Sequence, residues 1–248
     1  MCRTLRRLLV LDEAEIKKVL VVVAHPDDID FGGAGTVARL TEAGAEVVYC
    51  LVTDGDAGGF DRAVDNGGMA ALRRAEQTAA AKCVGVTDLR FLGYQDGVVE
   101  QTLGLRRDIT RVIRQVRPDL VITSAPERNY ERLGPSHPDH RAVGGATLDA
   151  VYPDARNPYT FPELLADEGL EAWTVREVWL TGGMTVNHYV DVTSTVDRKI
   201  AALRAHESQT AHVPDLDGMV KGWLSGHAAA AGLPEGSYAE AFQRVITA

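Results

Sequence analysis

Apolar residues in the first part of the chain follow two alternating patterns. Residues 19–24, VLVVVA, are a continuous and mostly β-branched run, which is typical of a strand buried on both faces of a parallel sheet. Residues 31–43 then show helical spacing that ends at Gly44, and residues 46–53 form a second apolar strand. This order predicts a βαβ unit.

The same alternation continues through most of the chain. It predicts helices over residues 70–83, 105–117 and 196–206, the last capped by Thr193 or Ser194, and strands over residues 89–92, 119–123, 175–181 and 189–192. We therefore predict a single-domain α/β fold over residues 1–248, with a Rossmann-like, mostly parallel sheet and helices on both faces. The Gly/Ala-rich segment from Asp215 onward has no clear pattern.

Polar loops follow four of the predicted strands, at residues 25–28, 54–65, 93–97 and 124–140. In a parallel sheet of this class, ligands bind at the carboxyl ends of the strands. We therefore expect these four loops to converge on one edge of the sheet.

Composition and charge narrow the possible partners. The 26 basic and 35 acidic side chains give a formal charge of −9, and no basic stripe interrupts this balance, so nucleic-acid binding is not expected. The first residues contain no signal-peptide core, and no segment is apolar for the roughly 18 residues that a membrane span needs. Cys2, Cys50 and Cys83 lack paired spacing and are expected to be reduced and buried, as in a cytoplasmic protein.

Two of the loops carry clusters of metal-ligand residue types. The first cluster is AHPDD at residues 24–28, and the second is HPDH at residues 137–140. Two histidines and one carboxylate, with a fourth position open to water, are the usual ligands of a hydrolytic zinc site. The residues alone leave open which three of these side chains bind the ion.

The two signatures resemble those of the LmbE-like, or PIG-L-like, N-deacetylases. The resemblance extends to an Arg-x-x-Glu at residues 73–76, a Gly-x-x-Asp-Gly turn at residues 93–97 and AHESQ at residues 205–209. It covers residues 19–210 and leaves residues 211–248 as a C-terminal extension.

The resemblance implies roles for eight side chains. His25, Asp28 and His140 would bind Zn²⁺, with Fe²⁺ as an alternative metal. Asp27, His137 and Asp139 would act in catalysis, and Arg73 and Asp96 would contact substrate. In this scheme Asp27 is the general base, His137 stabilises the oxyanion, and Asp139 orients and charges His137. The group that protonates the leaving amine, Asp27 or His137, stays open.

The implied activity is hydrolysis of an N-acetyl group on an N-acetylglucosamine-type sugar or sugar conjugate, by a protein that could form a homo-oligomer. One alternative is a thiol-conjugate amidase or natural-product glycoside deacylase of the same family. An alternative of another class is a nucleotide-binding module that uses the Gly-rich residues 53–59, although no P-loop lysine or GxGxxG order is present. We otherwise expect this loop to be a mobile wall of the pocket.

Several of these residues also have structural interpretations. Asp27 or Asp28 could cap the following helix, Arg73 could form a solvated pair with Glu76 or Gln77, and Asp96 could stabilise its own turn. His206 is expected to be structural, but its AHESQ setting makes it worth testing. Among the aromatic residues, a tryptophan at the rim could stack on a sugar ring. The segments 127–135 and 152–173 are expected to set specificity.

Overall fold

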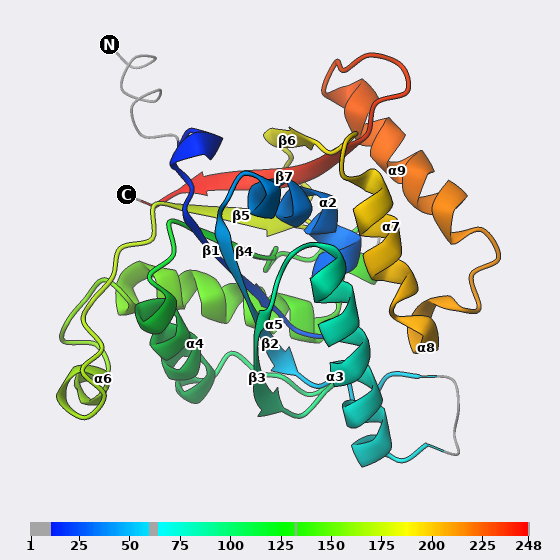
Figure 1. Ribbon diagram of the computed structural model, residues 1–248. Helices are drawn as coiled ribbons and strands as arrows, with labels where there is room; N and C mark the ends of the chain where they lie inside the picture. The colour runs from blue at the N-terminus through cyan, green and yellow to red at the C-terminus, as the bar shows by residue number, and fades with distance from the viewer. Residues whose placement is uncertain (1–10, 60–63, 132, 248) are drawn as a thin grey trace, which may run out of the picture.

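The computed structural model describes residues 11–59, 64–131 and 133–247, which form a seven-stranded mixed sheet between two layers of helices (Figure 1). The strand order is β3-β2-β1-β4-β5-β7-β6. The strands are β1 (Lys18–Val23), β2 (Glu46–Thr53), β3 (Asp88–Tyr94), β4 (Leu120–Ser124), β5 (Glu177–Thr181), β6 (His188–Asp191) and β7 (Ala239–Ile246).

The first five strands pair in parallel, and β7 pairs antiparallel with both β5 and β6. In β1, five of six residues are buried, because the strand lies between β2 and β4 and is covered on both faces. The predicted α/β class and mostly parallel sheet are confirmed.

Helices cover both faces of the sheet. One face packs against α2 (Asp28–Glu42), α3 (Asn66–Cys83), α7 (Val196–Arg204) and α9 (Leu216–Ala230), and the other against α4 (Leu103–Val116) and α5 (Pro138–Asp149). Figure 1 shows α9 beside α7, with which it makes contacts. The remaining elements are short: η1 (Glu13–Glu15), η2 (Gly134–Ser136), η3 (Ala150–Asp154), α6 (Pro162–Ala166) and α8 (Glu207–Thr210).

The C-terminal extension is part of the same sheet. The sequence pattern predicted neither α9 nor β7, yet β7 lies between β5 and β6. The predicted cap of α7 was also wrong, because its N-cap residue is Thr195, whose hydroxyl donates to the carbonyl of Gly35.

Of the cysteines that the structure describes, neither Cys50 nor Cys83 belongs to a group of side chains that could share a metal ion. Cys50 is buried, as predicted, whereas Cys83 is only partly buried at the end of α3, and both are free. Cys2 lies outside the described residues. No helix in residues 11–59, 64–131 or 133–247 is long and apolar enough to cross a membrane.

A buried ion pair ties the extension to the helices beside it. Lys199 in α7 and Glu240 in β7 lie 2.7 Å apart, and each side chain is 2% exposed. Glu240 also accepts the backbone N–H groups of Gly35 and Thr36, and Lys199 donates to the carbonyl of Asp30. The pair therefore joins α2, α7 and β7.

This junction gives a stability prediction. Glu240→Gln preserves the shape but leaves the buried charge of Lys199 uncompensated, so we expect the free energy of unfolding to fall by about 3–5 kcal/mol in urea denaturation. The matched control is Glu46→Gln in the exposed Lys18–Glu46 pair, which should cost less than about 1 kcal/mol. Equal losses in the two variants would contradict this account of the junction.

Candidate metal centre and active site

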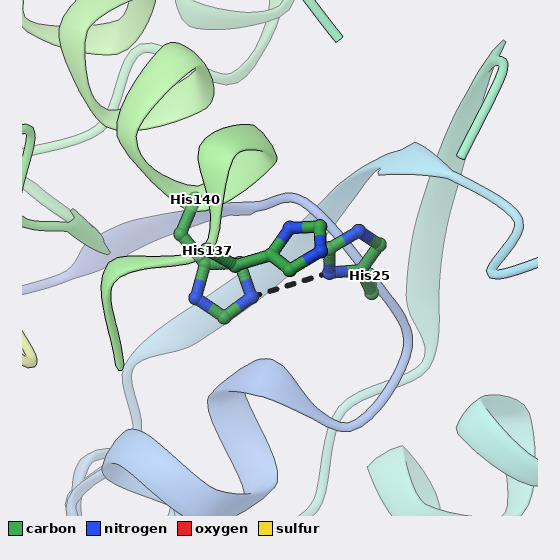
Figure 2. A group of neighbouring side chains, drawn as sticks. All are labelled: His25, His137 and His140. Atoms are coloured by element: carbon green, nitrogen blue, oxygen red, sulfur yellow. Dashed lines mark hydrogen bonds between the residues drawn. The ribbon is translucent and has the colours of Figure 1, made fainter. Parts of the chain in front are cut away.

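The two signature loops are shaped by helix starts. His137 is the N-cap of α5, and Pro138 occupies the first helical position, where a missing N–H costs nothing. This places His140 in the first turn, facing the end of β1. His25 follows β1 directly, and Figure 2 shows its ring beside those of His137 and His140.

Asp27 has an uncommon backbone conformation. It immediately precedes α2 and has a φ of 87°, in the left-handed region that costs a non-glycine residue about 1–3 kcal/mol. Its side chain makes no capping hydrogen bond to the helix. Helix capping therefore does not explain the backbone conformation of Asp27. Backbone strain of this kind is concentrated at functional sites.

The side chains of His25, Asp28 and His140 approach one another in pairs to within 3.6 Å. His25 Nδ1 lies 3.2 Å from His140 Nε2 and 3.6 Å from Asp28 Oδ2, and His140 Nε2 lies 2.9 Å from Asp28 Oδ1. Ligand atoms about 2.0–2.1 Å from a tetrahedral zinc ion lie about 3.3–3.4 Å from one another. The two imidazoles and one carboxylate thus fit a zinc ion in both chemistry and spacing.

Two other groups of side chains are also close enough to share an ion. They are His25, His137 and His140, and His25, Asp96 and Asp139, each with ligand atoms within 4.8 Å of one another. We favour the set that contains Asp28, because its contacts are short and its two nitrogens and one oxygen match a hydrolytic site.

Two carboxylates hold the other side of the His25 ring. His25 Nε2 lies 2.9 Å from Asp96 Oδ1 and 3.2 Å from Asp139 Oδ2. Such outer carboxylates orient a ligating histidine and leave its other nitrogen for the metal. Asp96, which we expected to contact substrate, therefore also positions His25.

The position of Asp139 differs from our expectation. Its carboxylate accepts the backbone N–H groups of Gly97 and Val99 and contacts His25, but it makes no hydrogen bond to the described ring of His137. The first turn of α5 directs this side chain back toward the loop after β3. In this structure Asp139 orients His25 rather than His137.

His137 has a defined hydrogen-bonding pattern. Its Nδ1 accepts the backbone N–H of Asp139 at 3.3 Å, which leaves the proton of the neutral ring on Nε2. Burial and the charge of His25 lower the pKa of His137 despite the charge of Asp139. The role expected for Asp139, to charge His137, stays a prediction, and the neutral ring can donate from Nε2.

His25 and Asp28 shift the pKa values of each other's side chains in opposite directions. Burial lowers the pKa of His25, but the charge of Asp28 and hydrogen bonds with Asp139, Asp28 and Asp96 outweigh it and raise the pKa to about 12. Burial alone would raise the pKa of Asp28, yet the charges of His140 and His25 hold it well below its usual range. The charges of the two histidines therefore favour the ionised form of Asp28.

The buried Arg73 pairs with the partly buried Asp27 beside this cluster. Arg73 is 3% exposed, and its Nη2 donates to Asp27 Oδ2 at 3.0 Å and to the carbonyl of Pro26. A solvated helix-face pair therefore does not describe Arg73. Burial and the charge of Asp28 raise the pKa of Asp27 to about 7, although Arg73 opposes this.

A cavity of about 940 Å³ opens onto the cluster. Its lining includes five side chains of the two signature segments together with Arg73 and Asp96: His25, Asp27, Asp28, His137, His140, Arg73 and Asp96. Ala57 and Gly58 in the loop after β2 also line it, as do Asn129, Gly134 and Pro135 from the segment 127–135.

Part of the cavity lining comes from the extension, which the sequence left without a role. Val220, Trp223 and Leu224 of α9 line the cavity together with Phe31 and Val186, and these five side chains form its apolar wall. No described residue of the segment 152–173 lines the cavity, so the specificity expected there is not supported. The rim tryptophan is Trp223.

Gly144 sets how closely α5 approaches the sheet. A Cβ atom at this position would collide with the carbonyl of Ser124 at the end of β4. The absence of a side chain lets α5, which carries His140, lie directly against the strand end.

Comparisons with known proteins agree with this geometry. The family model for PIG-L, GlcNAc-PI de-N-acetylase, matches residues 20–151. Diacetylchitobiose deacetylase of Thermococcus kodakarensis is 34% identical over 195 residues, which cover 79% of this chain and 71% of the relative. A probable N-acetyl-alpha-D-glucosaminyl L-malate deacetylase 2 of Bacillus cereus is 32% identical over 78% of this chain and 84% of the relative.

Among solved structures, N,N'-diacetylchitobiose deacetylase from Pyrococcus horikoshii, in complex with its inhibitor MPG, superposes with a TM-score of 0.88 at 29% identity. The superposition covers 99% of this chain and 91% of that one. The match therefore includes the extension as well as the signature loops. On the family model and these relatives together, the chain belongs to the PIG-L family of de-N-acetylases.

Proposed function

We propose that this chain is a zinc-dependent hydrolase that removes the acetyl group from the nitrogen of an N-acetylglucosamine unit in a sugar conjugate. The observation that carries the proposal is the close approach of His25 Nδ1, His140 Nε2 and the two oxygens of Asp28, with contacts of 2.9–3.6 Å, beside the partly buried carboxylate of Asp27. The relatives named as deacetylases of such sugars supply the substrate class.

His25, Asp28 and His140 would hold the ion, with Asp96 and Asp139 fixing the ring of His25. When bound, zinc lowers the pKa of a water molecule to about 7 and polarises the substrate carbonyl. The residues around it then supply the proton transfers and stabilise the developing charge.

We assign the proton transfers to Asp27, which lies beside Asp28 in the same cavity. Asp27 takes one proton from the water molecule as the water oxygen bonds to the carbonyl carbon. It then returns this proton to the nitrogen as the C–N bond breaks. The second proton of the water ends on the amine, so the products are acetate and an ammonium group. Nε2 of His137 donates a hydrogen bond to the carbonyl oxygen as its negative charge develops.

The size of the cavity favours a substrate larger than one sugar. At about 940 Å³ it lies near the upper end of the range for small-molecule pockets, and its lining includes the apolar wall as well as the candidate ligands. With the N-acetyl group at the metal centre, the second unit of the conjugate would lie against this wall.

The activity can be tested directly. Protein with one zinc ion per chain should release acetate from N-acetylglucosamine conjugates, and a chelator should reduce the release to background until zinc is restored. The substrate panel includes a neutral N-acetylated disaccharide, a malate glycoside, a thiol conjugate and long-chain N-acyl glucosamines. Preference for a thiol conjugate or a long acyl chain would instead favour the alternative activities, and no release from any substrate would sink the proposal.

Two variants separate metal binding from proton transfer. Asp27→Asn should lower kcat by about 10²- to 10⁴-fold at unchanged zinc content, because an amide cannot take the proton and Asn tolerates a positive φ. His140→Ala should lose zinc together with activity. Zinc content is measured by atomic absorption, and an active Asp27→Asn enzyme would exclude Asp27 as the base.

Trp223 should affect binding of the second sugar unit. It is 42% exposed and lines the apolar wall, so Trp223→Ala should raise KM for a disaccharide by about 3- to 10-fold with little change in kcat. Tyr159→Ala, in the segment 152–173 outside the cavity, is the matched control and should change neither constant. A fall in kcat at constant KM would argue against a role for Trp223 in binding.

A further inference from the structure

A chain of hydrogen bonds leads from Asp27 into the interior of the protein. The backbone N–H of Asp27 donates to Gln77 Oε1 at 2.8 Å, and Gln77 Nε2 donates to Asp30 Oδ2 at 2.9 Å. The same oxygen of Asp30 lies 2.9 Å from His206 Nε2. These bonds join the start of α2, the middle of α3 and the residue before α8.

All three side chains beyond Asp27 are fully buried. Asp30, Gln77 and His206 are each 0% exposed, so water does not compete for their hydrogen bonds. Asp30 Oδ1 has no hydrogen-bond partner among the described residues. The two donors at Oδ2 therefore offset the cost of burying this carboxyl group. Loss of either donor would therefore disturb Asp30.

The neighbours of Gln77 fix which way its amide faces. A backbone N–H can only donate, so the amide oxygen must face Asp27, and the amide NH₂ then faces Asp30. A reversed amide would place a donor against a donor and an acceptor against an acceptor. His206 supports this orientation because it shares the acceptor on Asp30.

Asp27 needs such support because its backbone is strained. At a φ of 87°, the residue stays in place only when its surroundings hold it there. Arg73 holds the carboxylate, whereas Gln77 holds the backbone N–H. Because α2 begins at the next residue, relaxation of Asp27 to a negative φ would turn its carboxylate away from the cavity.

We propose that Gln77, Asp30 and His206 form a positioning network that keeps Asp27 in the conformation from which its carboxylate acts. The proposal rests on the proposed function of Asp27. It gives His206 and the AHESQ segment a role at a distance from the metal, since none of the three side chains of the network touches His25 or His140 in the described contacts.

The first test is Gln77→Met, which keeps the length of the side chain and removes its hydrogen bonds. We expect kcat to fall by about 10- to 100-fold, because small misplacements of a catalytic group have effects of this size. KM should stay within about threefold, and zinc content and zinc affinity, measured by competition with a chromogenic chelator, should be unchanged. Gln77→Asn, whose shorter amide cannot reach both partners, gives the same test if Gln77→Met does not fold.

The second test is a rescue at His206. His206→Phe removes the donor to Asp30 and should lower kcat as Gln77→Met does. His206→Gln can still present an N–H to Asp30, so it should keep kcat within about fivefold of the wild type. A purely structural histidine would not distinguish these variants by kcat per bound zinc.

The matched control is Glu76→Gln. Glu76 precedes Gln77 in α3, is also buried, and accepts from the backbone N–H and hydroxyl of Ser208 in α8, but it lies outside the network. This variant should lower the melting temperature without lowering kcat per bound zinc. If it lowers kcat as much as Gln77→Met, or if Gln77→Met and His206→Phe keep wild-type kcat, the proposal is overturned.

A structural readout separates this proposal from the proposed function. In a crystal structure of zinc-loaded Gln77→Met, Asp27 should leave the positive-φ region while His25, Asp28 and His140 keep their positions. This result would support the network even if the wild type released no acetate. An unmoved Asp27 in that crystal would overturn the network even if the wild type were fully active.

Discussion

The arrangement of the site depends on the ring of His25 being held from both sides. Asp96 and Asp139 contact Nε2, and Nδ1 therefore faces Asp28 and His140. These contacts join the loops after β1 and β3 to the start of α5, which come from distant parts of the chain. Without the two carboxylates the ring could rotate, and the three ligand atoms would no longer face one point.

The two signature loops of this site were accessible from the sequence, because each follows the end of a predicted strand. A buried β-branched run that stops at His25-Pro26 locates both the strand and the first ligand loop. Parallel strands place their carboxyl ends at one edge, so convergence of the 25–28 and 137–140 loops followed from the predicted topology. The family resemblance then chose among ligand candidates that spacing alone left open.

Other features of the site could not be predicted, because contacts between distant parts of the chain are not visible in the sequence. Asp139 is two residues from His137, but the first helical turn directs its side chain toward the loop after β3. Arg73 and Asp96 carry charges that suit a substrate, and both also have protein partners that only the tertiary structure reveals. The helix α9 was missed because Gly218, Gly222 and Gly226 weaken its helical signal, although its apolar residues line the cavity.

The close approach of Gly144 in α5 to the end of β4 suggests how such a site could be lost during evolution. At Gly144, α5 lies directly against the end of β4, and any side chain there would push the helix outward. Such a shift would separate His140 from His25 while leaving every ligand residue in place. A homologue with an intact HPDH signature and a bulky residue at this position is therefore a candidate pseudoenzyme, recognisable only from a position outside the signature.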